Sequence, residues 1–544
     1  MRPVPGSARL FAALLLVSCQ ERAVPAAAEG GDPARGGTAV VVSAGDLDHA
    51  NPLVTADRLT QEVLRYALLL PLLSYDAELS LEPALAREWT VEGDTAVLFR
   101  IRRDVRWHDG VPTSAHDVAF TFQRARDPRT AFPNADWVAG WGAPAVLDSF
   151  TIRFPVEGTD PLAMIPFLPI APRHLLDSIP PERMRQARYN HAPVGNGPFR
   201  FVEYQANDRW VFAANPDFPQ ALGGRPYLDR LVWRIVPDGT AETTELQTGN
   251  AHLALGLRVE QAVAAARDTD LRIVLRESPQ YGFIGWNGRR KPLNDVGVRH
   301  AIALALDRAE MIDVLRAGHG TPASGPIGRW HWAYDTSLAP VPFAPDSARA
   351  LLDAAGLRDR DGDGVREMAD GSRLHLTLKV PAGSGYNRDL GEMIVADLRA
   401  VGIATDLVPT EWSTMISDVT SPQRSFDAVL MGWETDFRLD LRALFHSAQI
   451  DNPYQFAGYA NPVADSLLDV LAGEGDRDTA RAAYHRLQQL LRDEQPWGFL
   501  YYYPDMYVAS ARLRGLDMDI RGRLVNLPRW WLVGAAQSTG ADTK

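Results

Sequence analysis

The chain has 544 residues, of which 46% are hydrophobic, and its 56 Lys and Arg residues against 68 Asp and Glu residues give a net charge of −12. A chain of this size can bury a large core and is expected to form two or three domains. The acidic balance argues against a nucleic-acid-binding protein, and the single cysteine, Cys19, excludes a disulfide framework or a thiolate metal site in the folded part.

An export signal precedes the folded part. Two arginines stand before the apolar run 10–17, which is too short to span a bilayer. The sequence Leu-Val-Ser-Cys that ends at Cys19 resembles a bacterial lipobox, with an ordinary signal peptide and a chance cysteine as the alternative. We therefore predict a lipoprotein signal peptide over 1–18, a flexible tether over 19–37, and a protein anchored to the membrane through Cys19, in the periplasm or at the cell surface.

The first motifs of the folded part indicate structure. Hydrophobic patterns predict, in chain order, a strand at 38–42, a helix at 60–73 and a strand at 96–102. The sequence His108-Asp109-Gly110 predicts a turn that closes a hairpin, and Ser114 with Asp117 predicts a capping box for the next helix. Catalysis by His108 and Asp109 is the alternative, but no nucleophile or second base lies nearby in the sequence.

Further elements follow along the chain. The glycines of Val-Gly-Asn-Gly-Pro-Phe at 194–199 permit a backbone turn into a strand, and no Lys-Ser/Thr pair follows that would indicate a phosphate loop. Later patterns predict a strand at 231–236, a helix at 240–249, a strand at 281–287, a long helix at 298–318 and a strand at 495–503.

These motifs resemble the signature of the family 5 extracellular solute-binding proteins. The resemblance includes Glu-Pro-Ala-Leu-Ala-Arg-Glu-Trp at 82–89, Val-Arg-Trp-His-Asp-Gly-Val-Pro at 105–112 and Phe-Ala-Gly-Tyr-Ala-Asn-Pro at 456–462. The family comprises the binding components of peptide, dipeptide and nickel importers of the ABC type. The resemblance implies an α/β, periplasmic-binding-protein-like fold of class II, in the large three-domain form, with two lobes joined by a hinge and the ligand cleft between them.

The same resemblance divides the chain into domains. We expect a discontinuous domain I at 38–58, 190–278 and 504–535, a domain II at 59–189 and a domain III, the second lobe, at 279–503. The chain would cross into the second lobe near Ser278 and return near Tyr503. Paired crossings make a hinge that can close as a unit.

The candidate ligand site follows a run of βαβ units. Strands predicted at 373–380, 403–408 and 427–431 alternate with helices predicted at 388–401 and 411–418, which indicates a parallel sheet. Ligands of open α/β sheets bind beyond the carboxyl ends of the strands, which is where Gly432, Trp433 and Asp436 follow the last strand. In the alternative, Trp433 belongs to the core and Asp436 caps a helix.

The resemblance assigns roles to these residues. It implies that Asp436 receives the α-ammonium of a peptide and that Trp433 forms an aromatic wall, and we assign Gly432 and Tyr281 to the same site. Relatives often have Asp-Pro three residues further on, whereas this chain has Leu-Asp-Leu at 439–441. That departure bears on the length and side chains of the peptide. A nickel chelate is the alternative ligand, with His446 as its candidate histidine.

A weak calcium candidate stands apart from this site. Asp359, Asp361, Asp363 and Asp370 match a calcium-loop pattern in which aspartate replaces the final glutamate. No helix pair flanks the pattern, so it favours a solvated acidic turn, with calcium as the alternative. We assign no metal and no cofactor to the protein.

The sequence favours a binding protein over an enzyme. It contains no Gly-x-Ser-x-Gly elbow and no His-Glu-x-x-His motif, so a secreted hydrolase is the less favoured hypothesis. We therefore expect a monomeric, lipid-anchored substrate-binding protein that captures di- or oligopeptides outside the cytoplasmic membrane and delivers them to ABC permease subunits. The sequence is also compatible with a binder of a different small solute and with a sensor subunit that feeds no importer.

Overall fold

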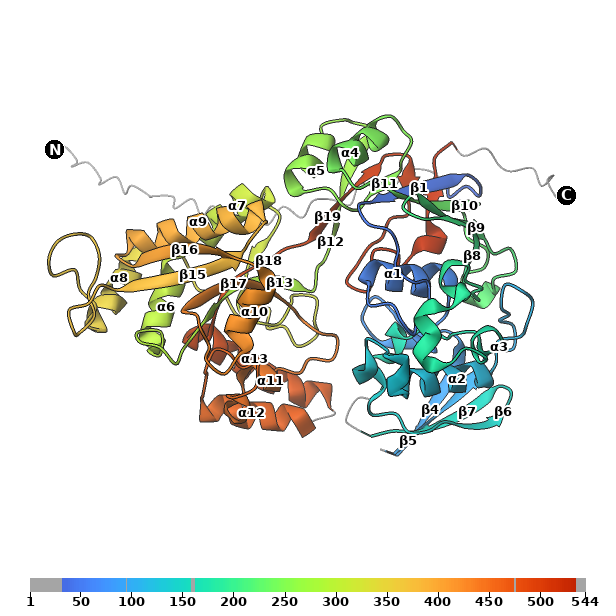
Figure 1. Ribbon diagram of the computed structural model, residues 1–544, viewed down its shortest axis with the longest axis horizontal. Helices are drawn as coiled ribbons and strands as arrows, with labels where there is room; N and C mark the ends of the chain where they lie inside the picture. The colour runs from blue at the N-terminus through green and yellow to red at the C-terminus, as the bar shows by residue number, and fades with distance from the viewer. Residues whose placement is uncertain (1–31, 94, 158–161, 474–475, 535–544) are drawn as a thin grey trace, which may run out of the picture. The chain divides into compact units, whose positions relative to one another are not determined.

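The computed structural model describes residues 32–534 except 94, 158–161 and 474–475 (Figure 1). The predicted signal peptide at 1–18, the lipidation site Cys19 and most of the tether at 19–37 lie outside the described residues. None of the helices in the described part has the length and apolar character of a membrane span.

The first lobe contains a seven-stranded sheet with the strand order β12-β19-β11-β1-β10-β9-β8. Its strands are β1 (Thr38–Ser43), β8 (Phe199–Gln205), β9 (Arg209–Ala214), β10 (Arg230–Ile235), β11 (Leu253–Ala254), β12 (Leu271–Arg276) and β19 (Asp505–Ser510). Strand β1 runs parallel to β10 and β11, and the other pairs are antiparallel. Trp210, Trp233 and Trp530 are fully buried in its core, and the helices α4 (Gly239–Gln247) and α5 (Val259–Ala265) follow β10 and β11.

The first lobe also contains a four-stranded antiparallel sheet and two small two-stranded sheets, β2 (Leu73–Tyr75) with β3 (Leu81–Pro83) and β20 (Leu513–Arg514) with β21 (Trp531–Leu532). The order of the four-stranded sheet is β4-β5-β7-β6, from β4 (Ala86–Glu92), β5 (Ala96–Ile101), β6 (Ala145–Asp148) and β7 (Thr151–Pro155). Helix α2 (Ala115–Arg126) packs Phe122 against Phe154 of this sheet, with ring centroids 4.5 Å apart. The predicted capping box is confirmed, because Ser114 and Asp117 exchange both of its hydrogen bonds at the start of α2.

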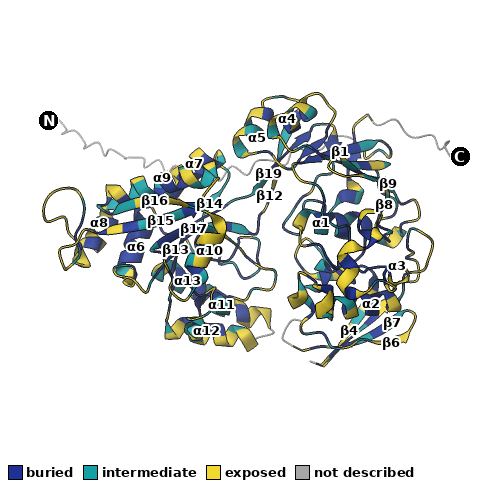
Figure 2. Ribbon diagram, viewed as in Figure 1, coloured by how far each residue is buried: buried dark blue, intermediate teal, exposed yellow. Residues whose placement is uncertain are grey.

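The second lobe, which we define as the chain from β13 to β18, contains a six-stranded sheet of order β14-β18-β13-β17-β15-β16. Its strands are β13 (Gln280–Trp286), β14 (Thr321–Pro322), β15 (His375–Pro381), β16 (Ala404–Thr410), β17 (Ala428–Glu434) and β18 (Trp497–Tyr502). Its helices are α6 (Val296–Ala305), α7 (Arg308–Arg316), α8 (Pro345–Ala354), α9 (Gly385–Ala400), α10 (Trp412–Thr420), α11 (Arg442–Phe445), α12 (Pro462–Gly473) and α13 (Arg477–Glu494). Figure 2 shows buried residues concentrated in the strands and on the helix faces that cover them.

The predicted parallel sheet is only half of this sheet. Strand β15 runs parallel to both β16 and β17, as the βαβ pattern predicts. Strand β17, however, pairs antiparallel with β13, and β13 pairs antiparallel with β18. The antiparallel half comes from strands that enter and leave the lobe, so its pairing joins segments that are far apart in the sequence.

Helix α9 illustrates how local sequence produces these elements. The Ser384 side chain accepts a hydrogen bond from the Asn387 backbone N–H at its start. Leu390, Ile394 and Leu398 recur every four residues and are buried against the sheet. Gly402, with φ +85°, then adopts the left-handed conformation that ends such helices.

The helix predicted at 60–73 is wrong in its second half. Helix α1 (Arg58–Val63) continues into one π-helical turn, Leu64–Leu68, and stops there. The Leu68 carbonyl accepts hydrogen bonds from the backbone N–H groups of Asn196 and Gly197 at 2.9 and 2.8 Å. The Leu70 N–H donates to the Asn196 side chain at 2.9 Å, so a distant segment takes the backbone groups that a longer helix would need.

The long helix predicted at 298–318 is two helices. Leu306 leaves the helical conformation, and the Asp307 side chain accepts a hydrogen bond from the Glu310 N–H at the start of α7. The buried Arg308 guanidinium donates to the carbonyls of Ala303 at 2.8 Å and Leu306 at 3.4 Å. The break is stable because this guanidinium satisfies carbonyls that the interrupted helix leaves free.

The two lobes are joined by two short connections. Residues 277–279 link β12 to β13, and residues 503–504 link β18 to β19. In both cases the strand before the connection and the strand after it belong to different sheets. The two strands that enter and leave the second lobe, β13 and β18, are also direct neighbours in its sheet.

Candidate ligand-binding cleft

Strand β17 carries part of the predicted site itself. It extends three residues beyond the predicted end at Met431 and includes Gly432 and Trp433. Trp433 is paired with Tyr281 of β13, and Gly432 with Gly282. Asp436 lies two residues beyond the end of the strand, where it does not cap a helix.

Trp433 and Asp436 line a cavity of about 520 Å³, a volume suited to a small-molecule ligand. The second lobe supplies most of its wall, and the first lobe supplies Asp136 and Met164. An adjoining cavity of about 550 Å³ shares Trp433 and Asp436 and adds Gly432, Trp412 and Gln280. Three of the four predicted ligand-binding residues therefore lie together at cavity walls.

Tyr281 occupies a different place. Its side chain is fully buried (0% exposed), and its ring lies near those of Phe283, Phe499 and Tyr502, with centroids 6.1 to 6.3 Å apart. It lines neither of the two cavities. In this structure Tyr281 belongs to the core beneath the site, because β13 is an interior strand of the sheet and its side chains are covered on both faces.

The Asp436 carboxylate carries a negative charge that is poorly compensated. The backbone N–H of Phe437 donates to its Oδ1 at 3.1 Å. Partial removal from water raises the pKa of Asp436, and the nearby charges of Asp136 and Glu434 raise it further, whereas the Phe437 N–H and Arg438 lower it. A ligand cation beside this carboxylate would relieve that cost.

The charges around the cavity favour a cationic group. Its carboxylates come from Asp136, Glu434, Asp436 and Asp440, and its guanidinium comes from Arg438. Because the walls are protein rather than water, these charges act on a bound group more strongly than exposed charges would. The sequence reasoning missed Asp136, which is far from Asp436 along the chain and carries no motif.

An aromatic cluster beside Asp436 was also missed. Phe437 of the second lobe stacks on Tyr75 of the first lobe, with centroids 5.7 Å apart and planes at 19°. It also meets Phe167 of the first lobe edge-on at 4.9 Å and lies 5.0 Å from Trp330 of the second. Pairs of this kind contribute about 0.5–1.5 kcal/mol each beyond the area that they bury. Phe437 thus joins the two lobes directly beside the candidate anchor.

The His108–Asp109 pair has a structural role. The His108 Nδ1 accepts a hydrogen bond from the Gly195 N–H at 3.2 Å, and its Nε2–H donates to the Gly197 carbonyl at 3.1 Å. Burial lowers the pKa of His108 from 6.5 to about 4, so the ring is neutral at pH 7. Asp109 instead accepts a hydrogen bond from His174 at 2.7 Å. The pair clips two segments together and does not form a catalytic dyad.

Gly195 and Gly197, the two glycines hydrogen-bonded to His108, are required because another backbone segment approaches them closely, and not because they form a turn. A Cβ at Gly195 would lie 1.9 Å from the Leu68 carbonyl oxygen, and one at Gly197 would lie 2.6 Å from that of Ala67. Neither glycine has a positive φ. The predicted turn is therefore corrected to a site of close packing between two chain segments.

His446, the candidate for a nickel chelate, is buried away from the cavity wall. Its Nδ1 accepts a hydrogen bond from the Ala448 N–H at 2.9 Å, and its Nε2 lies 3.3 Å from the carboxylate of Asp469 in α12. Its side chain packs between α11 and α12 and lines neither cavity.

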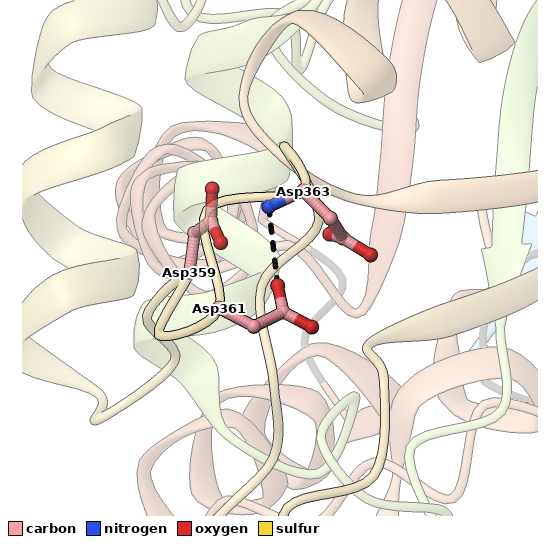
Figure 3. Close-up of side chains that lie close together, drawn as sticks. All are labelled: Asp359, Asp361 and Asp363. Carbon is pink, nitrogen blue, oxygen red and sulfur yellow. Dashed lines mark hydrogen bonds between the residues drawn. The ribbon is translucent and has the colours of Figure 1, made fainter.

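The acidic turn keeps its carboxylates close together at the surface. Carboxylate oxygens of Asp359, Asp361 and Asp363 lie within 4.8 Å of one another, and all three residues are exposed (Figure 3). They accept hydrogen bonds from backbone N–H groups of the turn, and Asp363 also pairs with Arg373. Asp370 is not part of this group and accepts from Ser372 instead. These contacts fit the predicted solvated turn.

Comparison with known proteins places this architecture in a family. The model of bacterial extracellular solute-binding proteins, family 5 Middle, matches residues 80–449. The oligopeptide-binding protein AppA of Bacillus subtilis is 28% identical over 514 residues, covering 92% of this chain and 93% of that protein. Heme-binding protein A of Haemophilus influenzae is 27% identical over 448 residues, covering 77% and 78%.

A solved structure agrees with these sequence relationships. The structure of Bacillus subtilis AppA in complex with a nonapeptide superposes with a TM-score of 0.71 at 27% identity, covering 92% of this chain and all of that chain. The family model alone spans more than half of the sequence, and the fold agrees with it over nearly the whole chain. The chain therefore belongs to the family 5 bacterial extracellular solute-binding proteins.

Proposed function

We propose that this protein captures peptides outside the cytoplasmic membrane and delivers them to the permease of an ABC importer. The observation that carries the proposal is Asp436, a carboxylate with a raised pKa at the wall of a cavity between the lobes. A peptide α-ammonium would neutralise this charge, and the neighbouring Trp433 would cover the first residue of the peptide.

The relatives support a peptide over other solutes. AppA is named an oligopeptide-binding protein, and the Escherichia coli dipeptide-binding protein is 25% identical over 447 residues. Another relative, of Haemophilus influenzae, is named a heme-binding protein. The excess of carboxylates around the cavity favours a ligand with a free ammonium group over an anionic one.

We also propose that the second lobe moves as a unit. The two connections at 277–279 and 503–504 give it a paired hinge, and the cavity takes its wall from both lobes. A ligand that touches both walls would favour the closed arrangement by the extra contacts that it makes there.

The membrane anchor is part of the same proposal. Lipidation at Cys19 would hold the binding protein near its permease through the tether at 19–37. Cys19→Ser should leave the folded part unchanged and move the protein from the membrane fraction to the soluble fraction. A wild-type protein found in the soluble fraction would contradict the anchor.

The decisive experiment measures binding of one peptide with a free N-terminus and the same peptide N-acetylated. Calorimetry should show that the wild type prefers the free peptide and that Asp436→Asn loses about ten- to a hundredfold in affinity for it, as expected for a charge-assisted hydrogen bond. Asp440→Asn is the matched control, because Asp440 lines the same cavity and its carboxylate already accepts from the Arg442 N–H at 2.9 Å. Equal affinity of the wild type for both peptides would overturn the assignment of Asp436.

A further inference from the structure

A third and larger cavity lies beside the candidate site. Its volume is about 1300 Å³, and it is lined by polar side chains of both lobes, among them Glu62, Arg276, Arg316, Ser384 and Asp505. It shares Gln280 with the 550 Å³ cavity that contains Asp436. The two spaces therefore meet at Gln280.

Four side chains cross the boundary between these spaces, and we call them the crossbar: Arg58, Glu434, Gln280 and Tyr503. Arg58 of the first lobe forms an ion pair with Glu434 at the end of β17. Gln280 donates from its Nε2 to Glu434 at 2.9 Å and accepts at its Oε1 from the Tyr503 hydroxyl at 3.1 Å.

The crossbar separates the two cavities by its position. Arg58 and Tyr503 line the large cavity, Glu434 lines the cavities that contain Asp436, and Gln280 lines both sides. A ligand that reaches from Asp436 past Gln280 into the large cavity would meet the Arg58–Glu434 pair.

Charge decides the direction in which a longer ligand would extend. Another cavity, of about 250 Å³, adjoins the 520 Å³ cavity through Asp136, Arg438 and Asp440, and its wall includes the carboxylates of Asp136, Glu157 and Asp440. Its two guanidinium groups belong to Arg438 and to Arg442, which is already paired with Asp469. The large cavity instead has as many guanidinium groups as carboxylates, so a terminal carboxylate is repelled less there.

We propose that the crossbar sets the length preference of the protein for peptides. Short peptides, such as a tripeptide, would stay on the Asp436 side of the crossbar and leave it intact. Longer peptides displace the Arg58–Glu434 pair and place their carboxyl end in the large cavity, because each further residue extends the chain by about 3.3–3.6 Å. This inference rests on the proposed peptide-binding function of Asp436.

The pair is suited to such a role because it is weak. Its side chains are 55% and 44% exposed, so water screens their attraction and separating them costs little. A ligand can therefore open the crossbar at an expense of about two- to fivefold in affinity. The crossbar would bias the choice of ligand without excluding long peptides.

The test compares a tripeptide with a nonapeptide that begins with the same three residues, by calorimetry on the mature protein. Arg58→Ala should raise affinity for the nonapeptide about two- to fivefold relative to the tripeptide. Arg58→Glu combined with Glu434→Arg restores a pair of opposite charges and should return the ratio of the two affinities to its wild-type value. Arg153→Ala is the control, because Arg153 pairs with Glu92 at similar exposure on the outer sheet of the first lobe.

Each outcome bears on one proposal or the other. The same ratio of affinities in the wild type, Arg58→Ala and the double variant would overturn the crossbar while leaving peptide binding intact. A ratio that changes equally in Arg153→Ala would also overturn it. If the wild type binds neither peptide, the proposed function fails and the crossbar fails with it.

Discussion

The glycines at 195 and 197 and the glycine at 432 stand in opposite surroundings. Around Gly195 and Gly197, carbonyls of the π-helical turn after α1 approach the backbone closely, and His108 clips the segment through both of its ring nitrogens. Beside Gly432 the nearest atom to an added Cβ would be 3.7 Å away, and the chain opens toward cavities. The sequence motif that contains Gly195 and Gly197 lies where close packing restricts each atom. The candidate ligand site beside Gly432 lies where hydrogen-bonding groups remain available for a ligand.

The largest expected effect comes from disrupting the close packing around Gly195. Gly195→Ala would place a methyl group 1.9 Å from the Leu68 carbonyl oxygen, so the backbone must move. We expect the free energy of unfolding to fall by about 3 kcal/mol or more, measured by urea denaturation. Gly473→Ala, at a glycine with nothing within 4 Å of an added Cβ, should change it by less than about 1 kcal/mol. Equal stability of the two variants would contradict the packing argument.

The buried His108, which is hydrogen-bonded to Gly195 and Gly197, should also make the stability of the fold sensitive to acid. Because burial lowers the pKa of His108 from 6.5 to about 4, the unfolded chain binds a proton at this residue before the folded chain does. Its contribution to the free energy of unfolding is complete above pH 6.5 and falls between pH 6.5 and 4, by up to about 3 kcal/mol. His108→Asn should remove this part of the pH dependence of urea denaturation. An unchanged slope between pH 6.5 and 4 would contradict the assignment.

At the candidate ligand site, acid should instead change the affinity for the ligand. The raised pKa of Asp436 means that the free protein takes up a proton there above the ordinary value of 3.8. A bound ammonium lowers that pKa again, so peptide affinity should be complete above the raised value and decrease as the pH falls through it. The loss should be at most the ten- to hundredfold expected for Asp436→Asn, and it should disappear in that variant. Calorimetry from neutral to acidic pH, with His108→Asn as a second background, separates the two residues.

The smallest expected effect comes from Phe437, which packs against the first lobe beside the candidate ligand site. Phe437→Ala removes the contacts with Tyr75 and Phe167, which contribute about 0.5–1.5 kcal/mol each. Small-angle scattering of the ligand-free variant should show a larger radius of gyration than the wild type, because fewer molecules are closed. Phe343→Ala, at an exposed phenylalanine of the second lobe, should leave the radius unchanged. A radius equal to that of the wild type in Phe437→Ala would contradict a role in closure.

Local patterns in the sequence predicted those parts of the fold that depend on neighbouring residues. The capping box at Ser114 and helix α9 are examples, because the partners that define them are within four residues. The end of α1 could not be predicted, because its cause is the segment around Asn196, which binds the backbone from far along the chain. The end of a helix can be predicted from the sequence only where neighbouring residues cause the helix to end.

The candidate site divides in the same way. Gly432 and Trp433 lie at the end of β17 and Asp436 follows two residues beyond it, so all three could be placed together from the sequence. Asp136 and Arg58 meet this segment only through the fold, and neither is part of a motif. Tyr281 of β13 is fully buried instead, and the pattern of residues along a strand cannot tell whether both faces of the sheet are covered.

The adjacency of β13 and β18 has a consequence for the evolution and engineering of the protein. Because the second lobe begins on one of these neighbouring strands and ends on the other, its two ends leave it side by side. A segment with adjoining ends can be exchanged between homologues as a cassette, since its replacement must match the host at one place and not at two distant ones. Transplanting residues 280–502 from a relative into this chain would produce a chimaera whose ligand choice reveals how much of specificity travels with that cassette.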